Sequence, residues 1–87
     1  MLNTIIFPNI NLPATGRRIR QLRMERNITV AELAEFMGFC DERAVYKWQS
    51  GASLPKIDHL YALSIIFQTT MEDIIVDDEE VRLGLYA

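Results

Sequence analysis

The stretch TVAELAEFMGFCDERAVYKWQSG, residues 29–51, decides the fold of this chain of 87 residues. It predicts two short helices joined by a tight corner. Thr29 is a suitable cap for the first helix, because its hydroxyl can accept a hydrogen bond from a backbone N–H one turn later. Three apolar residues then share one helical face: Leu33, Ala34 and Met37. Gly38 follows as a natural left-handed stop.

The corner at residues 39–40 (Phe-Cys) leads into a second predicted helix, which Asp41 opens and Gly51 closes. Val45 and Trp48 lie three positions apart, so both are expected to point inward as structural anchors. The polar residues of this helix must then point largely outward. They are Glu42, Arg43, Tyr46, Lys47 and Ser50. Two such helices crossing around a short turn form a helix-turn-helix, and an anchored surface helix can enter the major groove of DNA.

Length and composition favour one globular domain. The chain can bury one modest core, and 49% of its residues are apolar, which is typical of a folded protein. The single cysteine rules out an internal disulfide framework and is compatible with a reducing cytoplasm, where we expect the protein. Asn and Pro interrupt the partly apolar residues 1–12, which also lack a basic region, so we expect neither a signal peptide nor a membrane span.

Charge is distributed unevenly along the chain. The formal net charge is −3, but residues 68–87 hold six acids and one base, whereas residues 1–67 hold eight bases and six acids. The acidity therefore lies at the C-terminal end. Because attraction to phosphate depends on the local face, DNA binding is still expected, weak and salt-sensitive for a monomer.

Residues 1–13 (MLNTIIFPNINLP) are expected to form an extended N-terminal arm, because Pro8 and Pro13 oppose a helix. The arm either packs over the helical core to cover apolar surface or binds a partner. Entry into a DNA groove is disfavoured, because the arm has neither Arg nor Lys. We place the DNA-binding domain at residues 14–76 and an acidic C-terminal tail at residues 77–87, whose acids are expected to be solvated.

Residues 15–27 are expected to form the first helix, with Thr15 as its cap and Asn27 as its left-handed end. Ile19 and Leu22 are expected to face inward. The segment is rich in arginine: Arg17, Arg18, Arg20, Arg23 and Arg26. These side chains either form a solvated basic face or contact DNA phosphates, which would position the following helices without reading sequence.

A fourth helix is expected from Ile57 to Phe67, with a core stripe of Leu60, Leu63 and Phe67. Three apolar residues are surplus to that stripe: Tyr61, Ile65 and Ile66. Such a surplus on a small domain indicates a homodimer contact, or cover by the N-terminal arm. Thr70 begins a pattern resembling a capping box, for a short fifth helix through Ile75.

The ordered set of motifs resembles the helix-turn-helix DNA-binding domain of the Cro and phage-repressor type, also called the Xre family. The set comprises an Arg-rich first helix, T-x-x-E-L-A from Thr29, G-x(9)-W from Gly38 and G-x(3)-P from Gly51. The resemblance covers about residues 15–76, and the run AVYKWQSGASLPKIDHLYALSIIF (44–67) also resembles small bacterial regulators. It implies an all-α, five-helix lambda-repressor-like domain. It also implies a bacterial or phage transcriptional regulator, such as a repressor, that binds double-stranded DNA as a homodimer.

The resemblance identifies residues 41–50 as the recognition helix in the major groove. Its base-facing positions are Glu42, Arg43 and Lys47. Arg and Lys can donate to guanine O6 and N7, and Glu can accept from cytosine N4. Phosphate contacts are expected from a second set: Arg17, Arg18, Thr29, Tyr46, Ser50 and the backbone at Gly51. Asp41 and Glu42 are equally suited to capping the helix.

The chain departs from the family pattern at three places. Val30 stands where relatives usually carry Gln, and the stretch from Gly38 to Trp48 is one residue longer than is common. Gln49 stands where many relatives carry a Glu that pairs with Arg23. Here we expect an Arg23–Gln49 hydrogen bond in its place, with less charge assistance.

Neither catalysis nor a cofactor or metal is expected. Cys40 and His59 are the only residues of their kinds and stand far apart, whereas metal sites need clustered ligands and nucleophiles an oriented base. We expect Cys40 to be a small apolar corner residue and His59 to lie on the surface. The alternative to DNA binding is a protein-interaction module, antitoxin-like or repressor-antagonist, with a protein partner. The weak positive charge, the acidic end and the apolar arm favour it.

Overall fold

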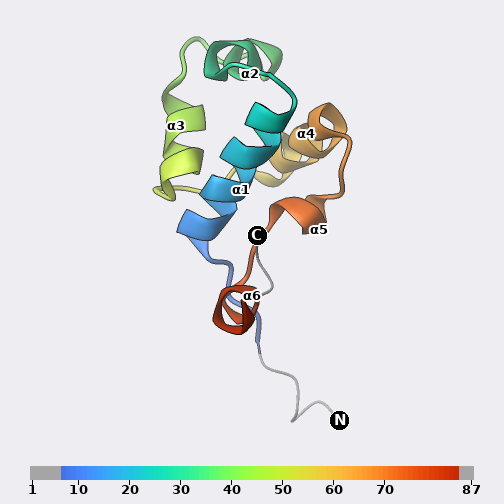
Figure 1. Ribbon diagram of the computed structural model, residues 1–87. Coiled ribbons are helices and arrows are strands. Elements are labelled where there is room, and N and C mark those ends of the chain that lie inside the picture. The colour runs from blue at the N-terminus through green and yellow to red at the C-terminus, as the bar shows by residue number, and fades with distance from the viewer. Residues whose placement is uncertain (1–6, 85–87) are drawn as a thin grey trace.

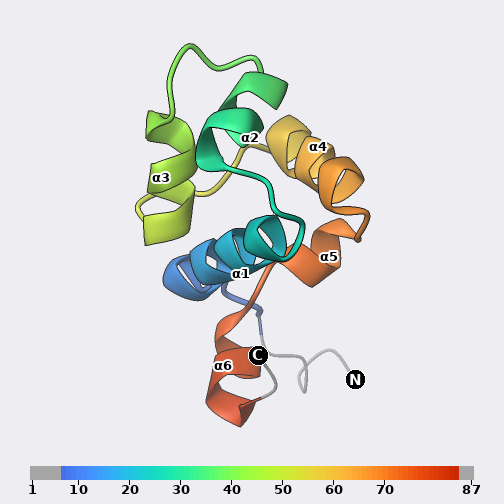
Figure 2. The same cartoon turned by 45° about the horizontal axis from the view of Figure 1, so that its top comes forward.

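The computed structural model describes residues 7–84, and these residues form six helices and no strand (Figure 1). The helices are α1 (Leu12–Glu25), α2 (Val30–Phe36), α3 (Arg43–Ser50), α4 (Ile57–Phe67), α5 (Met71–Ile74) and α6 (Asp78–Leu83). The first five form a bundle, while α6 lies outside it at the end where the N-terminal arm enters (Figure 2). The all-α prediction is confirmed, and α6 is an addition to the five expected helices.

The core is built from one face of each of α1 to α5. Its buried members are Ile19, Leu33, Ala34, Val45, Trp48, Leu60, Leu63, Phe67 and Ile74. Leu22 and Met37, which were also expected to face inward, are partly buried against this cluster. Each helix is too short to be stable alone, so burial of these apolar faces is what holds the bundle together.

The ends of α2 follow from its sequence. The Thr29 hydroxyl accepts from the Glu32 backbone N–H at 3.0 Å, and the Glu32 carboxylate accepts from the Thr29 N–H at 2.9 Å. This reciprocal pair is a capping box. Gly38 follows the helix with φ of +76°. The expected cap and the expected left-handed stop are therefore both confirmed.

Helix α1 begins earlier than expected, at Leu12 instead of residue 15. Asn11 caps it, because its side chain accepts from the Ala14 backbone N–H at 2.8 Å. Pro13 lies in the first turn, where a missing N–H removes no helical hydrogen bond. The prediction that Pro13 excludes this segment from a helix was wrong.

Thr15 is a buried residue and not a helix cap. Its hydroxyl accepts from the Val76 backbone N–H at 3.0 Å and contacts the Val76 carbonyl oxygen at 3.2 Å. The cap prediction was wrong because the long-range partner that satisfies Thr15 cannot be seen in local sequence. At the other end, Asn27 has φ of +56°, which confirms the predicted left-handed end of the segment.

The chain ends are tied together beside α1. The Asn11 N–H donates to the Val76 carbonyl and the Asp78 N–H donates to the Asn9 carbonyl, both at 2.8 Å. In its described part the arm therefore pairs with the C-terminal segment, and Phe7 stays 81% exposed. Residues 1–6 of the arm and 85–87 of the tail lie outside the described residues.

The acidic run at residues 77–80 begins a helix. Asp77 caps α6 by accepting from the Glu80 backbone N–H at 2.8 Å. The acids in its first turn interact favourably with the helix dipole. Asp78 and Glu79 are exposed, as expected of solvated acids. The helix itself was not expected, because an acidic run suits a solvated tail and a helix N-terminus equally well. Between residues 7 and 84, no helix is long and apolar enough to span a membrane.

Candidate nucleic-acid interface

Two buried side chains fix α3 against the core. Val45 is fully buried and Trp48 is 4% exposed. The Phe39 ring from the preceding turn meets the Trp48 ring edge-on, with centroids 5.6 Å apart. Since both anchors lie on one side of the helix, the opposite side faces solvent.

His59 and Cys40 lie differently from expectation. His59 is half-buried, and its ring meets the Phe39 ring at 4.9 Å and nearly perpendicular. It therefore belongs to an aromatic cluster with Phe39 and Trp48, and its expected surface position was wrong. Cys40 is at the corner as expected, but it is exposed. The described residues contain no group of three or more His, Cys, Asp or Glu that could hold a metal ion.

A close backbone approach sets the position of α3 relative to α1. A Cβ atom placed on Gly16 would lie 2.3 Å from the Trp48 carbonyl oxygen and 2.6 Å from that of Gln49. Only glycine allows α1 to pack this closely on the end of α3. Sequence analysis missed Gly16, although a glycine inside a predicted helix, where it costs stability, is a signal of such an approach.

A hydrogen bond joins the same two helices at their side chains. Arg23 Nε donates to Gln49 Oε1 at 2.9 Å, and Arg23 Nη1 donates to the Ile28 carbonyl at 2.7 Å. The expected Arg23–Gln49 pair is confirmed. Gln49 lies directly after Trp48, so this pair holds the C-terminal half of α3 in place.

The arginines of α1 divide between structural and surface positions. Arg26 Nε donates to the Phe67 carbonyl and Arg18 Nη1 to the Asp73 carbonyl, each at 2.7 Å. These two side chains therefore hold α1 against α4 and α5. Arg17 and Arg20 are exposed. The arginines of this segment therefore do not all share one role: some bond to neighbouring helices and others are exposed.

The outer side of α3 carries the predicted DNA contacts. Arg43, Tyr46, Lys47 and Ser50 are exposed, and Glu42 is half-buried. Helix α3 begins at Arg43, two residues later than expected, and the Glu42 side chain makes no capping hydrogen bond. The expectation that Asp41 opens the helix was therefore wrong by two residues. Asp41 instead lies in the approach to it.

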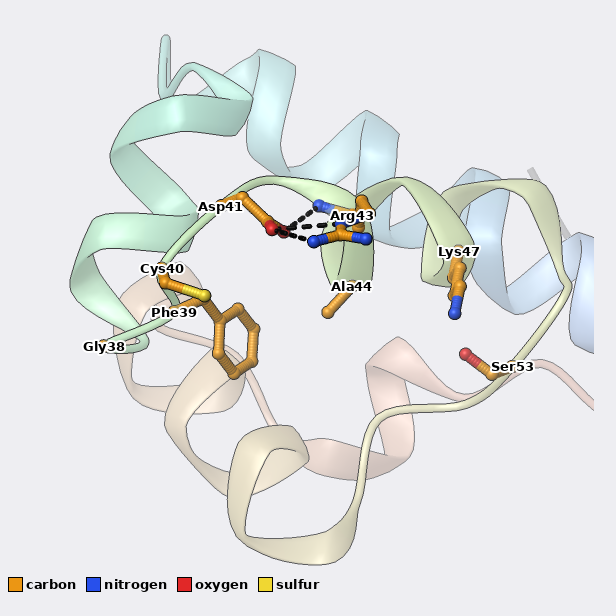
Figure 3. Close-up of a pocket in the computed structure, with 8 residues that line it drawn as sticks. All are labelled: Gly38, Phe39, Cys40, Asp41, Arg43, Ala44, Lys47 and Ser53. Carbon is orange, nitrogen blue, oxygen red and sulfur yellow. Dashed lines mark hydrogen bonds and ion pairs between the residues drawn. The ribbon is translucent and has the colours of Figure 1, made fainter.

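A hollow of about 590 Å³ lies along this side of α3 (Figure 3). Its lining comes from the corner between α2 and α3, from α3 itself and from Ser53. Arg43 and Lys47 stand one turn apart on α3, Ala44 lies below Arg43 in this view, and Lys47 points towards Ser53.

Asp41 and Arg43 form a two-sided contact within this hollow. Asp41 Oδ2 accepts from Arg43 Nη2 at 2.7 Å and from Arg43 Nε at 3.0 Å, while Oδ1 accepts from the Arg43 backbone N–H at 3.0 Å. The guanidinium hydrogen bonds, and then the backbone one, hold the pKa of Asp41 below its usual value. The same carboxylate raises the pKa of Arg43. Both groups are therefore charged at neutral pH.

Gly51 ends α3 with φ of +82°, and a Cβ there would lie 2.8 Å from Pro13.

On α4, two of the three predicted dimer residues are exposed: Tyr61 is 60% and Ile65 is 59% exposed. Ile66 is half-buried and packs against the core.

Comparisons with known proteins agree with this geometry. A family model described as helix-turn-helix matches residues 19–74. The HTH-type transcriptional activator BcrR of Enterococcus faecalis is 30% identical over 69 residues, which are 79% of this chain and 33% of that protein. The chain thus spans about a third of the length of this relative.

Two solved structures share the fold. The P22 c2 repressor in complex with a synthetic operator superposes with a TM-score of 0.64 and 28% identity, covering 69% of this chain and 89% of that one. The restriction-modification controller protein C.AhdI of Aeromonas hydrophila gives a TM-score of 0.65 at 21% identity, covering 72% of this chain and 94% of that one.

Proposed function

From the premise that the chain belongs to the helix-turn-helix family, we propose that it binds double-stranded DNA sequence-specifically as a transcriptional regulator. Helix α3 lies in the major groove, where donors and acceptors on the base edges identify each pair. The activity named for BcrR and the operator bound to the P22 c2 repressor support this proposal.

One observation carries the proposal: α3 has its apolar side buried and its cationic side exposed. Val45 and Trp48 fix the helix, and Arg43 and Lys47 stand on the opposite, solvent-facing side. Arg43 and Lys47 donate to guanine, and Glu42, beside them, accepts from cytosine. A groove-binding helix requires this arrangement, because the reading side chains must be held rigidly by residues that do not themselves contact DNA.

Phosphate contacts complete the proposed interface and set the register of α3. Tyr46 supplies a hydroxyl from α3, and the Thr29 terminus of α2 supplies N–H groups. Ser50 and the backbone at Gly51 were expected in the same role, but the Ser50 hydroxyl donates to the Lys47 carbonyl and the Gly51 N–H to the Trp48 carbonyl. The exposed Arg17 adds a charge from α1. Arg18 was expected in the same role, but its bond to the Asp73 carbonyl favours a structural one. Such contacts give affinity and salt dependence without sequence information.

The test selects bound sequences from a random duplex pool and measures variants on the selected site. Lys47→Ala should cost about 1–3 kcal/mol there and relax one base preference. The exposed Lys56, which precedes α4, provides the matched control: Lys56→Ala removes the same charge and should leave the preference unchanged. Arg17→Ala should weaken all sequences alike and reduce the salt slope by about 1. Retention of both affinity and preference by Lys47→Ala would exclude the proposed reading role.

The protein further assembles as a homodimer through α4. Ile57, Tyr61 and Ile65 are 71%, 60% and 59% exposed and follow one another at four-residue spacing. They therefore form a continuous apolar stripe along one face of the helix, the pattern of a subunit contact. A two-fold dimer would place two recognition helices on half-sites about one helical turn apart.

Sedimentation tests the dimer directly. Ile65→Glu should leave the fold intact and convert dimer to monomer, whereas Met24→Glu, an equally polar change at an exposed residue of α1, should not. Wild-type protein that remains monomeric at high micromolar concentration would refute the α4 contact while leaving DNA binding by α3 standing.

A further inference from the structure

Arg43 is held from one side only. A guanidinium group has five N–H donors in a rigid plane. Nε and one hydrogen of Nη2 point along one edge, and this edge is bound to Asp41 Oδ2. Among the described residues, no acceptor contacts Nη1. The end of the guanidinium, formed by Nη1 and the second hydrogen of Nη2, therefore keeps two parallel donors available.

We infer that Asp41 is a specificity-determining positioning residue, which grips Arg43 by its Nε edge and so presents the two end N–H groups, on Nη1 and Nη2, to a guanine. The inference rests on the proposed function. Guanine offers O6 and N7 as two adjacent acceptors in the major groove, and two parallel N–H donors match them. One arginine thus binds the carboxylate and the base at the same time.

The local backbone explains why an aspartate suits this position. Asp side chains readily accept from the backbone N–H two residues on, and Asp41 Oδ1 does so from Arg43 at 3.0 Å. That bond fixes the carboxylate, so Oδ2 holds the guanidinium from a rigid support. The side chain of Arg43 is 84% exposed, so packing does not order it. Asp41 supplies the order that burial would otherwise give.

The fixed geometry has a measurable consequence. Ordering a long side chain on binding weakens an interface by about two- to tenfold, and an arginine already ordered avoids that loss. The advantage applies where the two donors meet a guanine, so it appears as discrimination between bases and not as general affinity. A carboxylate near DNA also repels phosphate, which lowers affinity for every sequence alike.

The experiment compares base preferences of variants selected against the same random duplex pool. Asp41→Asn is the central variant, because its side-chain oxygen can still accept from the Arg43 N–H while its amide loses the charge that grips the guanidinium. In this variant the ratio of affinity for guanine over the other bases at one position should fall by about two- to tenfold. Arg43→Ala should lose about tenfold or more at the same position. Adding Asp41→Asn to Arg43→Ala should change the base preference no further.

Two controls separate this effect from charge and folding. Glu72→Gln removes one acid from α5, away from α3, and should keep the preference. Thermal unfolding should show Asp41→Asn folded like the wild type. Arg43→Lys should weaken the guanine preference, because an ammonium group can still donate to guanine but cannot hold the carboxylate and present two parallel donors together.

Three outcomes would overturn the inference, and they are distinguishable. If Asp41→Asn strengthens binding to all duplexes and keeps every base preference, the carboxylate only repels phosphate. If it sharpens the guanine preference, Asp41 withholds Arg43 from DNA. If the wild type retains no duplex even at low salt, the proposed function fails and this inference with it.

Discussion

Replacing Gly16 with alanine should destabilise the protein, although the same change normally stabilises a helix. The new Cβ would lie 2.3 Å from the Trp48 carbonyl oxygen and 2.6 Å from the Gln49 carbonyl oxygen. Both are backbone atoms of α3, so no side-chain rotation relieves the contact. The end of α3 must instead move away from α1 by about 1 Å to reach an ordinary van der Waals distance.

The expected magnitude follows from two opposing effects. Alanine favours a helix over glycine by about 1 kcal/mol, while forcing an extra carbon into a packed contact costs about 3 kcal/mol when backbone must move. The net loss is about 2 kcal/mol. For a domain of this size that lowers the Tm by about 8–16 °C.

Thermal unfolding followed by circular dichroism measures the change, and Trp48 fluorescence locates it. Trp48 is the only tryptophan, and its emission should shift in Gly16→Ala because its own carbonyl is displaced. Gly38→Ala is the control: Gly38 has φ of +76° and nothing within 4 Å, so it should lose stability through left-handed strain without altering the Trp48 spectrum. An unchanged or raised Tm for Gly16→Ala would refute the close approach of the two helices.

Three further changes test the supports of the site. Gln49→Glu should convert the Arg23 hydrogen bond of 2.9 Å into an ion pair and stabilise the fold by about 0.5 kcal/mol in urea unfolding, a gain that disappears in acid. Thr29→Ala should cost about 1 kcal/mol in the same assay, because the cap of α2 is lost; an unchanged urea midpoint would contradict the capping box. The Thr29 backbone N–H holds the pKa of Glu32 below its usual value. The ionised carboxylate therefore stabilises the fold at pH values above the pKa that Glu32 has in the unfolded chain. This stabilisation is lost as the pH falls through the lower pKa of the folded protein. Urea midpoints of wild type and Glu32→Gln should accordingly differ at neutral pH and converge in acid.

Local patterns in the sequence predicted most helix ends correctly. The α4 bounds and the caps at Thr29 and Thr70 match the structure, because capping and left-handed stops depend on residues within one turn of each other. The Arg23–Gln49 bond was also predicted, from resemblance to the family pattern. The errors at Thr15 and in the acidic run have different causes. Thr15 bonds to Val76, which is distant along the chain, whereas the acidic run suits a helix N-terminus and a solvated tail equally well in local sequence.

The sequence by itself determined that α3 exists, which side of it is apolar and which residues are cationic, because helical period and side-chain chemistry are local properties. Only the tertiary structure decided how α3 is held. The contact of Gly16 with the Trp48 carbonyl, the aromatic cluster around His59 and the edge-on grip of Asp41 on Arg43 arise from distances and angles between atoms. Those distances follow from packing the whole chain around one core, and no pattern of residue types fixes them in advance.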